Sequence, residues 1–433
     1  MTLFTPTPDI FNDETVLRHN TYTPDKIIGR DEELENYQYA LQPVINGAPP
    51  KHIIVNGKPG TGKTAMTNYL LSHLEADAKT YNIDITSVYI NCNGDTSGTS
   101  SYTIAIEIIN KLRAKRNSNT GEMSATGHPT KKVFNTLIDE LNATGGTTLI
   151  VLDEIHQLND EKLLYYIPRA PTSTHLNDDT HVGLIGISNI PSLFDTLSLD
   201  VNDTLDPETI HLGAYNSEEL AQILEARADD AFQADAIDTD VIRWCAAKVA
   251  DTGNARRAIT LVREAGEVAR NKNETPVTKE HVEAALEKLE TNHVLDAIRS
   301  LTMPQESVLL TVAFENREDL DVETPTKELY DTYTRFLDTA GYPAKSLNTF
   351  SNRLKDLEQQ ELITRNQTYS GGRQNKYKLA VDPVLVLEAI TDEFYDSILS
   401  PILYHGIKHG LFGTDEVEHL PIYEKRQEHH GDV

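Results

Sequence analysis

The sequence predicts an α/β domain built around a phosphate-binding loop, then a helical domain, then a C-terminal winged-helix domain. A glycine-rich loop at residues 56–64 lies between a short apolar run and an amphipathic stretch. Strand-like runs stop near Tyr215, and only helix-like patterns follow as far as about residue 291. From about Asn292 the pattern becomes three helices and two strands, which is the winged-helix order.

Composition places the chain among globular proteins with several domains. Its 433 residues, 39% of them hydrophobic, are too many for one small core. Cys92 and Cys245 lie far apart and indicate neither a disulfide framework nor a zinc site. The N-terminus resembles no export signal, and no apolar run has the length to span a bilayer. We therefore expect a cytoplasmic protein without a membrane partner.

The chain is strongly acidic, with 67 Asp and Glu residues against 39 Lys and Arg residues and a formal charge of −28. Taken alone, this balance argues against a nucleic-acid ligand. A second interpretation is that the surface is acidified for a salt-rich cytoplasm, where self-repulsion is screened. The acidic residues are spread through every segment, which favours the halophilic interpretation.

The expected domain limits follow changes in pattern along the chain: an extended arm at 1–20, the α/β base at 21–212, a helical lid at 213–291, the winged helix at 292–383 and an extension at 384–433. A Pro/Gly-punctuated turn before Asp31 leads into a helix with acidic residues in its first turn. Within that turn, Ile27 and Ile28 are candidates to pack on an adenine ring. Ordinary core packing is the alternative for each. His429 and His430 are interpreted as a solvated tail.

The loop from Asn56 to Thr64 carries the first half of a nucleotide site. Its glycines permit a tight turn, so that backbone N–H groups and the positive end of the next helix converge on a phosphate. Lys63 is expected to reach the β- and γ-phosphates, and the Thr64 hydroxyl to bind Mg²⁺. The residues predicted to cradle ATP or ADP are Gly57, Lys58, Pro59, Gly60, Thr61, Gly62, Lys63 and Thr64.

A buried strand over 149–152 ends in Asp153 and Glu154, at the sheet edge where α/β proteins place their ligands. We expect Asp153 to hold Mg²⁺ through its water shell. Glu154 is expected to orient and polarise the attacking water. Asn189, at the end of a third strand over 182–188, is a candidate to touch the γ-phosphate, with a turn cap as the alternative.

The helical domain contributes one further candidate. Gly253-Asn254-Ala255-Arg256-Arg257-Ala258 begins its third helix. An arginine at that place, on a lid over the nucleotide, would sense the γ-phosphate, and Arg256 is the predicted residue. Arg257 is interpreted as part of a solvated basic turn.

The C-terminal pattern predicts helices at 304–314, 325–339 and 347–360 and strands at 362–365 and 376–379. Residues 344–380 carry seven Lys or Arg against three acids, in contrast to the rest of the chain. We expect the third helix to enter a major groove and the wing to contact DNA. Binding of another protein is the alternative. The candidate DNA-binding residues are Asn348, Thr349, Asn352, Arg353, Arg373 and Lys376.

In this order, the motifs resemble the archaeal origin-recognition/cell-division-control type of replication initiator, an AAA+ ATPase with a winged helix, in a haloarchaeal form. The resemblance covers roughly residues 15 to 380 and includes the N-terminal box 22–32, the two nucleotide motifs and the two sensors. It implies ATP or ADP with Mg²⁺, binding of double-stranded origin DNA through the winged helix and a helical insertion around 100–114, recruitment of the replicative helicase, and contact with other initiator copies on DNA.

Two departures from the family pattern stand out. The family usually has Asp-Glu-Ile-Asp in its second motif, whereas His156 holds the last position here, outside the Mg²⁺ pair, and little effect is expected. The family's arginine finger follows its first sensor, but Asp200 stands at that position, and no Arg or Lys lies between Asn189 and Thr209. Such a finger is worth about 10³-fold or more in rate, so slow hydrolysis is expected.

Two other functions fit parts of the pattern. A transcriptional or plasmid-maintenance regulator would read an operator with the winged helix and use ATP as a signal. A remodelling ATPase would bind protein through the winged helix and would turn over briskly as a hexamer, which Asp200 speaks against.

Overall fold

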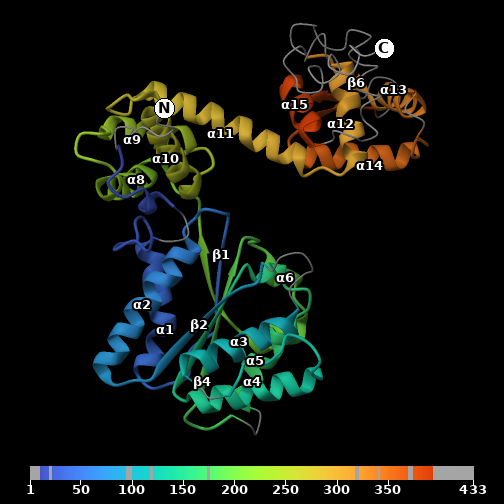
Figure 1. The fold of residues 1–433 in the computed structure, drawn as a ribbon. Helices are drawn as coiled ribbons and strands as arrows, with labels where there is room; N and C mark the ends of the chain where they lie inside the picture. The colour runs from blue at the N-terminus through green and yellow to red at the C-terminus, as the bar shows by residue number, and fades with distance from the viewer. Residues whose placement is uncertain are drawn as a thin grey trace, which may run out of the picture. The chain divides into compact units, whose positions relative to one another are not determined.

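The computed structural model describes residues 10–18, 22–93, 100–117, 120–172, 176–316, 321–339, 342–368 and 374–393. The chain divides into two compact units, Met1–Ala285 and Leu286–Val433 (Figure 1). The first unit holds the α/β base and most of the helical lid, and the second holds the winged helix. Together these confirm the predicted fold class. Across the described ranges, no helix is both long and apolar enough to cross a bilayer.

The base is a parallel sheet with strand order β2-β3-β4-β1-β5. Its strands are β1 (Ile53–Gly57), β2 (Ile85–Asn91), β3 (Thr147–Asp153), β4 (His181–Ser188) and β5 (Glu208–Leu212). β1 is central, and its Val55 pairs with Ile187 on one side and Ile210 on the other. Because helices cover both faces, β1, β3 and β4 are almost wholly apolar and buried.

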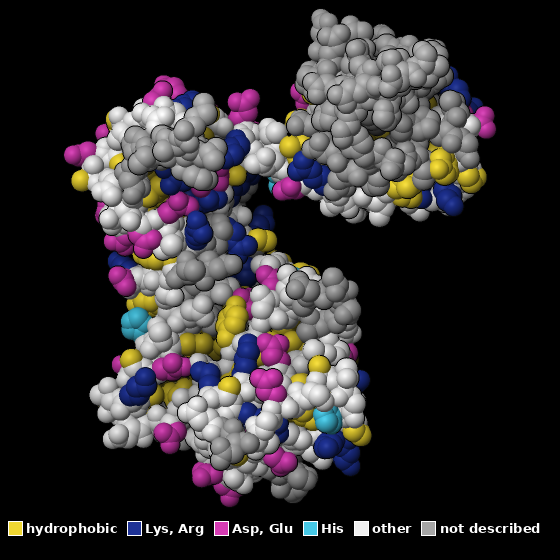
Figure 2. Space-filling model, viewed as in Figure 1, with side chains coloured by type: hydrophobic (Ala, Val, Ile, Leu, Met, Phe, Trp, Pro, Cys, Tyr) yellow, Lys and Arg dark blue, Asp and Glu magenta, His cyan; other side chains and the backbone are white. Residues whose placement is uncertain are grey.

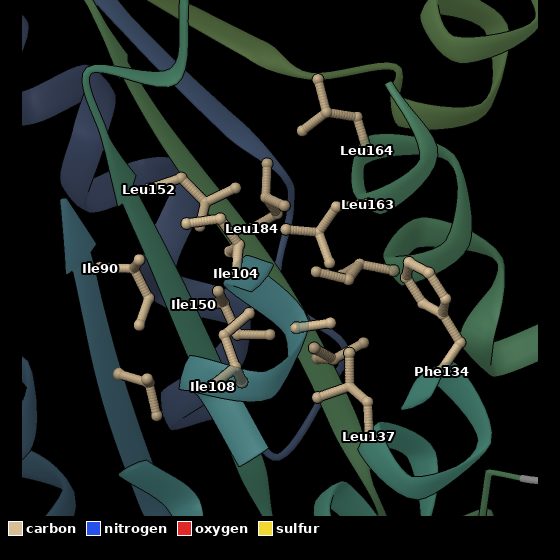
Figure 3. Packing of buried hydrophobic residues seen from close by; sticks show 14 of the residues in the cluster. Ile90, Ile104, Ile108, Phe134, Leu137, Ile150, Leu152, Leu163, Leu164 and Leu184 are labelled. Carbon is tan, nitrogen blue, oxygen red and sulfur yellow. The ribbon is translucent and has the colours of Figure 1, made fainter. Parts of the chain in front are cut away.

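Successive residues of the central strands alternate between two cores. One core faces α1 (Asp31–Ile45) and α2 (Lys63–Tyr81). The other faces α3 (Ser101–Lys115), α4 (Thr130–Thr144) and α5 (Lys162–Arg169), as Figures 1 and 3 show. Packing on both faces fixes the strand register, and the carboxyl ends of β1, β3 and β4 therefore meet at one edge of the sheet.

The expected DNA-contacting insertion around 100–114 coincides with α3, which is largely a core helix. Its buried residues include Ile104, Ile108 and Leu112, and only Thr103, Ala114 and Lys115 are exposed along it. A salt-bridged carboxylate, Glu140 on α4, joins Arg113 and Arg116. Contact between this segment and DNA stays a prediction.

The lid consists of α8 (Ser217–Ala231), α9 (Thr239–Val249), α10 (Ala255–Lys272) and the beginning of α11 (Lys279–Arg299). The described part of the N-terminal segment packs on this lid, whereas an extended arm is expected there. Residues 10–18 include the short helix η1 (Glu14–Leu17). Ile10 and Phe11 are buried, and the rings of Phe11 and Phe232 lie 4.9 Å apart. Apolar residues within a Pro/Thr-rich segment explain the difference.

The second unit has the predicted winged-helix order: α12 (Met303–Glu315), β6 (Thr324–Pro325), α13 (Thr326–Thr339), α14 (Leu347–Gln359), β7 (Ile363–Thr368), β8 (Gln374–Leu379) and α15 (Pro383–Glu393). The three strands pair in the order β6-β8-β7. On α14, Phe350, Leu354 and Leu357 are fully buried in the core of this unit. The opposite side of α14 is thereby left exposed.

Acidic side chains are scattered over the visible face of the base and lid, with Lys and Arg among them (Figure 2). This distribution agrees with acidification of the whole surface, since no single segment accounts for the charge of −28.

His52, next to β1, gives the base a pH-dependent stability. Its Nδ1 accepts a hydrogen bond from the Leu184 N–H at 3.1 Å, and burial lowers the pKa of His52 to about 4. Below pH 6.5 the unfolded chain takes up a proton on His52 that the folded chain does not take up. The free energy of unfolding therefore decreases as the pH is lowered, by about 2 kcal/mol at pH 5 relative to neutral pH. In His52→Asn the amide oxygen can accept the same bond without titrating. We expect denaturant unfolding of this variant to lose less stability than the wild type between pH 7 and pH 5.

Candidate nucleotide and DNA sites

The predicted phosphate loop connects β1 to α2. Lys63 begins α2, and its Nζ donates to the carbonyls of Gly57 and Lys58, both at 2.8 Å. The Thr61 hydroxyl donates to the Lys58 carbonyl at 2.9 Å. Lys63 is only 6% exposed, so the loop wraps around its ammonium group. Bound phosphate oxygens would compete with the carbonyls of Gly57 and Lys58 for the three N–H donors of the Lys63 ammonium group.

The lid lies directly against this loop. Ala255 N donates to the Gly60 carbonyl at 3.0 Å. Gly60 and Gly62 have φ values of +77° and +90°, and a Cβ would lie 1.8 Å from Asn254 Oδ1 at Gly60 and 2.6 Å from the Tyr215 hydroxyl at Gly62. The Arg30 guanidinium lies 4.1 Å from the centre of the Tyr215 ring. The glycines are therefore required both for the turn and for close approach of the lid.

We expect Gly60→Ala to lower nucleotide affinity by about tenfold or more, because the left-handed backbone costs about 1–2 kcal/mol and the new methyl group displaces Asn254. Gly213→Ala is a matched control, since Gly213 has open space and no positive φ. Nucleotide titrations of both variants check this. An unchanged affinity in Gly60→Ala would show that the loop and lid separate in solution.

Asp153 at the end of β3 is held by three donors. Its Oδ2 accepts from Thr64 Oγ1 at 2.9 Å and from the Tyr89 hydroxyl, and its Oδ1 accepts from Glu154 N at 2.9 Å. Burial and the Asp153 carboxylate both raise the pKa of Tyr89. Tyr89 is absent from the sequence prediction. The observed strand register explains its position, because Asn91 pairs with Asp153 and Tyr89 lies two residues earlier on the same side of β2.

Glu154 follows Asp153 in a left-handed conformation, with φ of +55°. Asn189 Nδ2 donates to both of its carboxylate oxygens, at 2.8 and 2.7 Å. His156 Nε2 lies 3.2 Å from Glu154 Oε2. Glu154 and Asn189, two separately predicted candidates, are thus in direct contact. The expectation that His156 has little effect does not account for its contact with the same carboxylate.

Two cations face this group of residues. Burial lowers the pKa of Lys63 to about 8, although Glu154 and Asp153 raise it, and the nearby charge of Arg256 lowers it further. Arg256 is exposed, and its guanidinium has no partner in the part of the chain that the structure describes. Repulsion between two nearby cations is relieved by an anion. Arg257 differs, since its backbone N–H binds the Asn254 side chain that caps α10.

Ile27 and Ile28 differ in their surroundings. Ile27 is 7% exposed and belongs to the core that includes Met66 and Leu70, which favours core packing for this residue. Ile28 is half-buried and keeps part of its surface available. Of the two, Ile28 is the better candidate for contact with an adenine ring.

The residues present fit a magnesium nucleotide. The loop offers backbone N–H groups, Lys63 and Arg256 offer positive charge, and Thr64 with Asp153 offers oxygen ligands. Within the described ranges, no group of three or more His, Cys, Asp or Glu residues could hold a metal ion. A divalent cation here would therefore take most of its ligands from phosphate and water, as Mg²⁺ commonly does.

On α14, Asn348, Thr349 and Asn352 are exposed, as predicted. Arg353 is half-buried, and its NH1 donates to the Tyr333 hydroxyl at 3.4 Å. Lys376 lies on β8, half-buried. Arg373, the predicted wing residue, lies outside the described residues.

Ion pairs divide the basic residues of the winged helix into two groups. Arg365 pairs with Glu358 at 3.1 Å, and Lys378 pairs with Asp321 at 2.9 Å. Lys345, Lys355 and Lys376 have no ion-pair partner among the residues that the structure describes. Among the described lysines of residues 344–380, these three therefore keep their positive charge available.

Asp200 lies exposed in the first turn of the short helix α7 (Leu199–Leu205). The sequence has no Arg or Lys from residue 190 to residue 208. This helix therefore cannot supply a cation to a neighbouring copy.

Family models match three consecutive parts of the chain: an AAA domain at 48–194, the Cdc6 AAA+ ATPase-type lid domain at 221–287, and the CDC6 C-terminal winged helix domain at 296–389. ORC1-type DNA replication protein 2 of Haloarcula marismortui is 38% identical over 389 residues, which cover 88% of this chain and 92% of that protein. ORC1-type DNA replication protein 10 of Halobacterium salinarum is 38% identical over 384 residues, with 88% and 90% covered. These haloarchaeal relatives confirm the halophilic interpretation.

Solved structures match most of the chain. The Aeropyrum pernix ORC1 protein, solved in complex with DNA, matches with a TM-score of 0.74 and 29% identity, covering 89% of this chain and 97% of that one. The Aeropyrum pernix ORC2 protein, in its ADPNP–ADP complexes, matches with a TM-score of 0.59 at 18% identity, covering 92% and 100%. The second likeness concerns the fold alone.

Proposed function

The chain belongs to the family of ORC1-type DNA replication proteins, and on this premise we propose that it is an ATP-dependent replication initiator. It binds double-stranded origin DNA through its winged helix, uses ATP or ADP with Mg²⁺ as a switch, and helps to recruit the replicative helicase. The relatives' names and the DNA complex of the Aeropyrum pernix ORC1 protein support this proposal.

The observation that carries the nucleotide part is the convergence of opposite charges on one loop. Lys63 and Arg256 bind the β- and γ-phosphates, while Thr64 and Asp153 hold Mg²⁺ and its water shell. Glu154 orients the attacking water, and Asn189 contacts the γ-phosphate. The contacts of Thr64 with Asp153 and of Asn189 with Glu154, and the electrostatic interaction of Lys63 with Asp153, Glu154 and Arg256, support this assignment.

Arg256 also connects the nucleotide to the lid. It stands two residues after Asn254, whose side chain lies against Gly60 of the phosphate loop. A γ-phosphate that attracts Arg256 therefore favours closure of the lid on the loop. Loss of that phosphate removes the attraction, which gives the ATP and ADP states different lid positions.

The DNA part rests on the exposed polar side of α14 and on the unpaired lysines beside it. In concentrated salt, counterion release gives little affinity, so base contacts and DNA shape supply more of the binding free energy. Asn348, Thr349 and Asn352 offer the amide and hydroxyl groups that base edges in a major groove can recognise.

Hydrolysis is expected to be slow and independent of self-association. Asp200 occupies the family's finger position, and a cation supplied from a neighbour is worth about 10³-fold or more in rate. Turnover per molecule should therefore stay nearly constant as protein concentration rises. Steep, cooperative acceleration in such an assay would contradict this expectation.

The test of the whole proposal is immunoprecipitation from cells in their native salt, followed by sequencing of the bound DNA. Enrichment at a few intergenic sites that coincide with replication start points is the expected result. Enrichment at scattered promoters would favour a transcriptional or plasmid-maintenance regulator, a function that is compatible with the absence of the arginine finger. No enrichment above background would overturn the DNA-binding role.

A further inference from the structure

The Glu154 carboxylate has two neighbours of different kinds. Asn189 donates to both of its oxygens, at 2.8 and 2.7 Å. The His156 ring approaches from another direction, with Nε2 3.2 Å from Oε2. A carboxylate that polarises water must offer an oxygen to that water, so these contacts compete with the water for the oxygens of Glu154.

His156 is built into this contact. It lies in the 3-10 helix η2 (Ile155–Gln157), which begins directly after the left-handed Glu154. Its side chain is 11% exposed, and within the described residues its buried Nδ1 has no hydrogen-bond partner. Among the described residues, the contact with Glu154 is thus the only polar interaction of this ring. At 3.2 Å this is a close polar contact, which attracts the carboxylate when Nε2 carries a hydrogen.

The two contacts respond differently to bound ATP. Asn189 is proposed to turn its amide toward the γ-phosphate, and Glu154 then loses both bonds from that side chain. His156 lies two residues after Glu154, in the same turn, and is given no role at the phosphate. Its contact with Glu154 can therefore persist after Asn189 has turned.

We propose that His156 is a positioning residue that restrains Glu154 after ATP has bound and thereby lengthens the life of the ATP state. This inference rests on the proposed ATPase function of Glu154. An aspartate, the residue expected at position 156 from the family pattern, would repel Glu154 instead of holding it. The restraint and the missing finger act in the same direction, since both slow hydrolysis without weakening nucleotide binding.

The test compares His156→Leu, His156→Asp and His156→Gln in full-length protein. ATP is bound first, a single turnover is followed by the release of labelled phosphate, and ATP and ADP affinities are measured separately by titration. We expect about three- to tenfold faster turnover in the leucine and aspartate variants, because a polar contact worth about 1 kcal/mol is lost. His156→Gln keeps an N–H donor within reach of Oε2 and should restore the wild-type rate. Affinities should change by less than about twofold.

A second pair of variants separates this inference from the proposed function. Glu154→Gln should abolish turnover and bind ATP normally, and Glu154→Gln combined with His156→Leu should be equally inactive. If turnover depends on Glu154 but His156→Leu is no faster than the wild type, the restraint is wrong and the proposed function stands. If turnover does not depend on Glu154, both are wrong. If His156→Leu loses both ATP affinity and turnover rate, His156 has a merely structural role, and the proposed restraint of Glu154 is also wrong.

Discussion

Replacement of Lys63 by alanine is expected to lower the affinity for ATP and ADP by about 100-fold or more. The ammonium group is the charged donor nearest the loop carbonyls of Gly57 and Lys58, at 2.8 Å from each. Charge-assisted hydrogen bonds to phosphate contribute about 1.5–3 kcal/mol each, and Lys63 would make at least one to each of two phosphates. Titration calorimetry of the variant and the wild type measures the loss directly.

The fold should survive this substitution. Burial lowers the pKa of Lys63 to about 8, so the folded chain tolerates the ammonium group less well than the unfolded chain does. Its removal at pH 7 therefore takes away a group that opposes folding. The thermal midpoint without nucleotide should stay close to the wild-type value, while the increase that ADP causes should disappear. Lys63→Met keeps the apolar stem of the side chain and serves as a second variant.

The same pKa gives the wild type a pH signature. Phosphates bind the protonated lysine, so ADP affinity measured in EDTA should be constant below about pH 8 and fall as pH rises further. Binding above pH 8 should be accompanied by proton uptake. A variant of Lys63 with wild-type affinity, or an affinity that does not change up to pH 9.5, would contradict the role given to this residue.

The sequence predicts most of the base because its strands are buried on both faces. The runs in β1, β3 and β4 are continuous and apolar, and they lead directly into the motifs. β5 was not predicted, since Glu208, Thr209 and His211 break its pattern at the edge of the sheet. Its place next to β1 follows from hydrogen bonding to a strand about 155 residues earlier, which no local pattern reveals.

The candidate site likewise contains residues that the sequence predicts and residues that only the structure reveals. Lys63, Thr64, Asp153 and Glu154 are found from spacing, because the chemistry of a phosphate loop requires fixed neighbours along the chain. Tyr89 and Tyr215 come from other elements, and only the three-dimensional structure brings them to Asp153 and to Gly62.

For the winged helix, local sequence gives the excess of basic residues but not their pairing. Lys378 pairs with Asp321, which is 57 residues away in the chain. Arg365 pairs with Glu358 on α14. Neither pair can be derived from charge counts. The paired and unpaired lysines of one small domain therefore make a matched set for a test of DNA binding.

The double variant Lys355→Gln and Lys376→Gln is expected to lose about tenfold or more in affinity for double-stranded DNA. Both side chains lack an ion-pair partner among the described residues, so both are available to phosphates. Each phosphate contact contributes about 0.9 to the slope of log affinity against log salt concentration, so this slope should fall by about two units. Fluorescence anisotropy over a series of KCl concentrations gives both quantities.

Lys378→Gln is the matched control, because the Lys378 charge is already engaged by Asp321 on the same small domain. Lys378→Gln should lower the salt slope by much less than half of the decrease that the double variant causes. ATP affinity should be unchanged in both the double variant and the control, since none of these lysines belongs to the phosphate loop. If Lys378→Gln lowers the slope by about one unit, half of the decrease expected for the double variant, the ion pair opens on DNA, and the free charge is not confined to the unpaired lysines. If the double variant binds DNA like the wild type at every salt concentration, the winged helix is a protein-binding module.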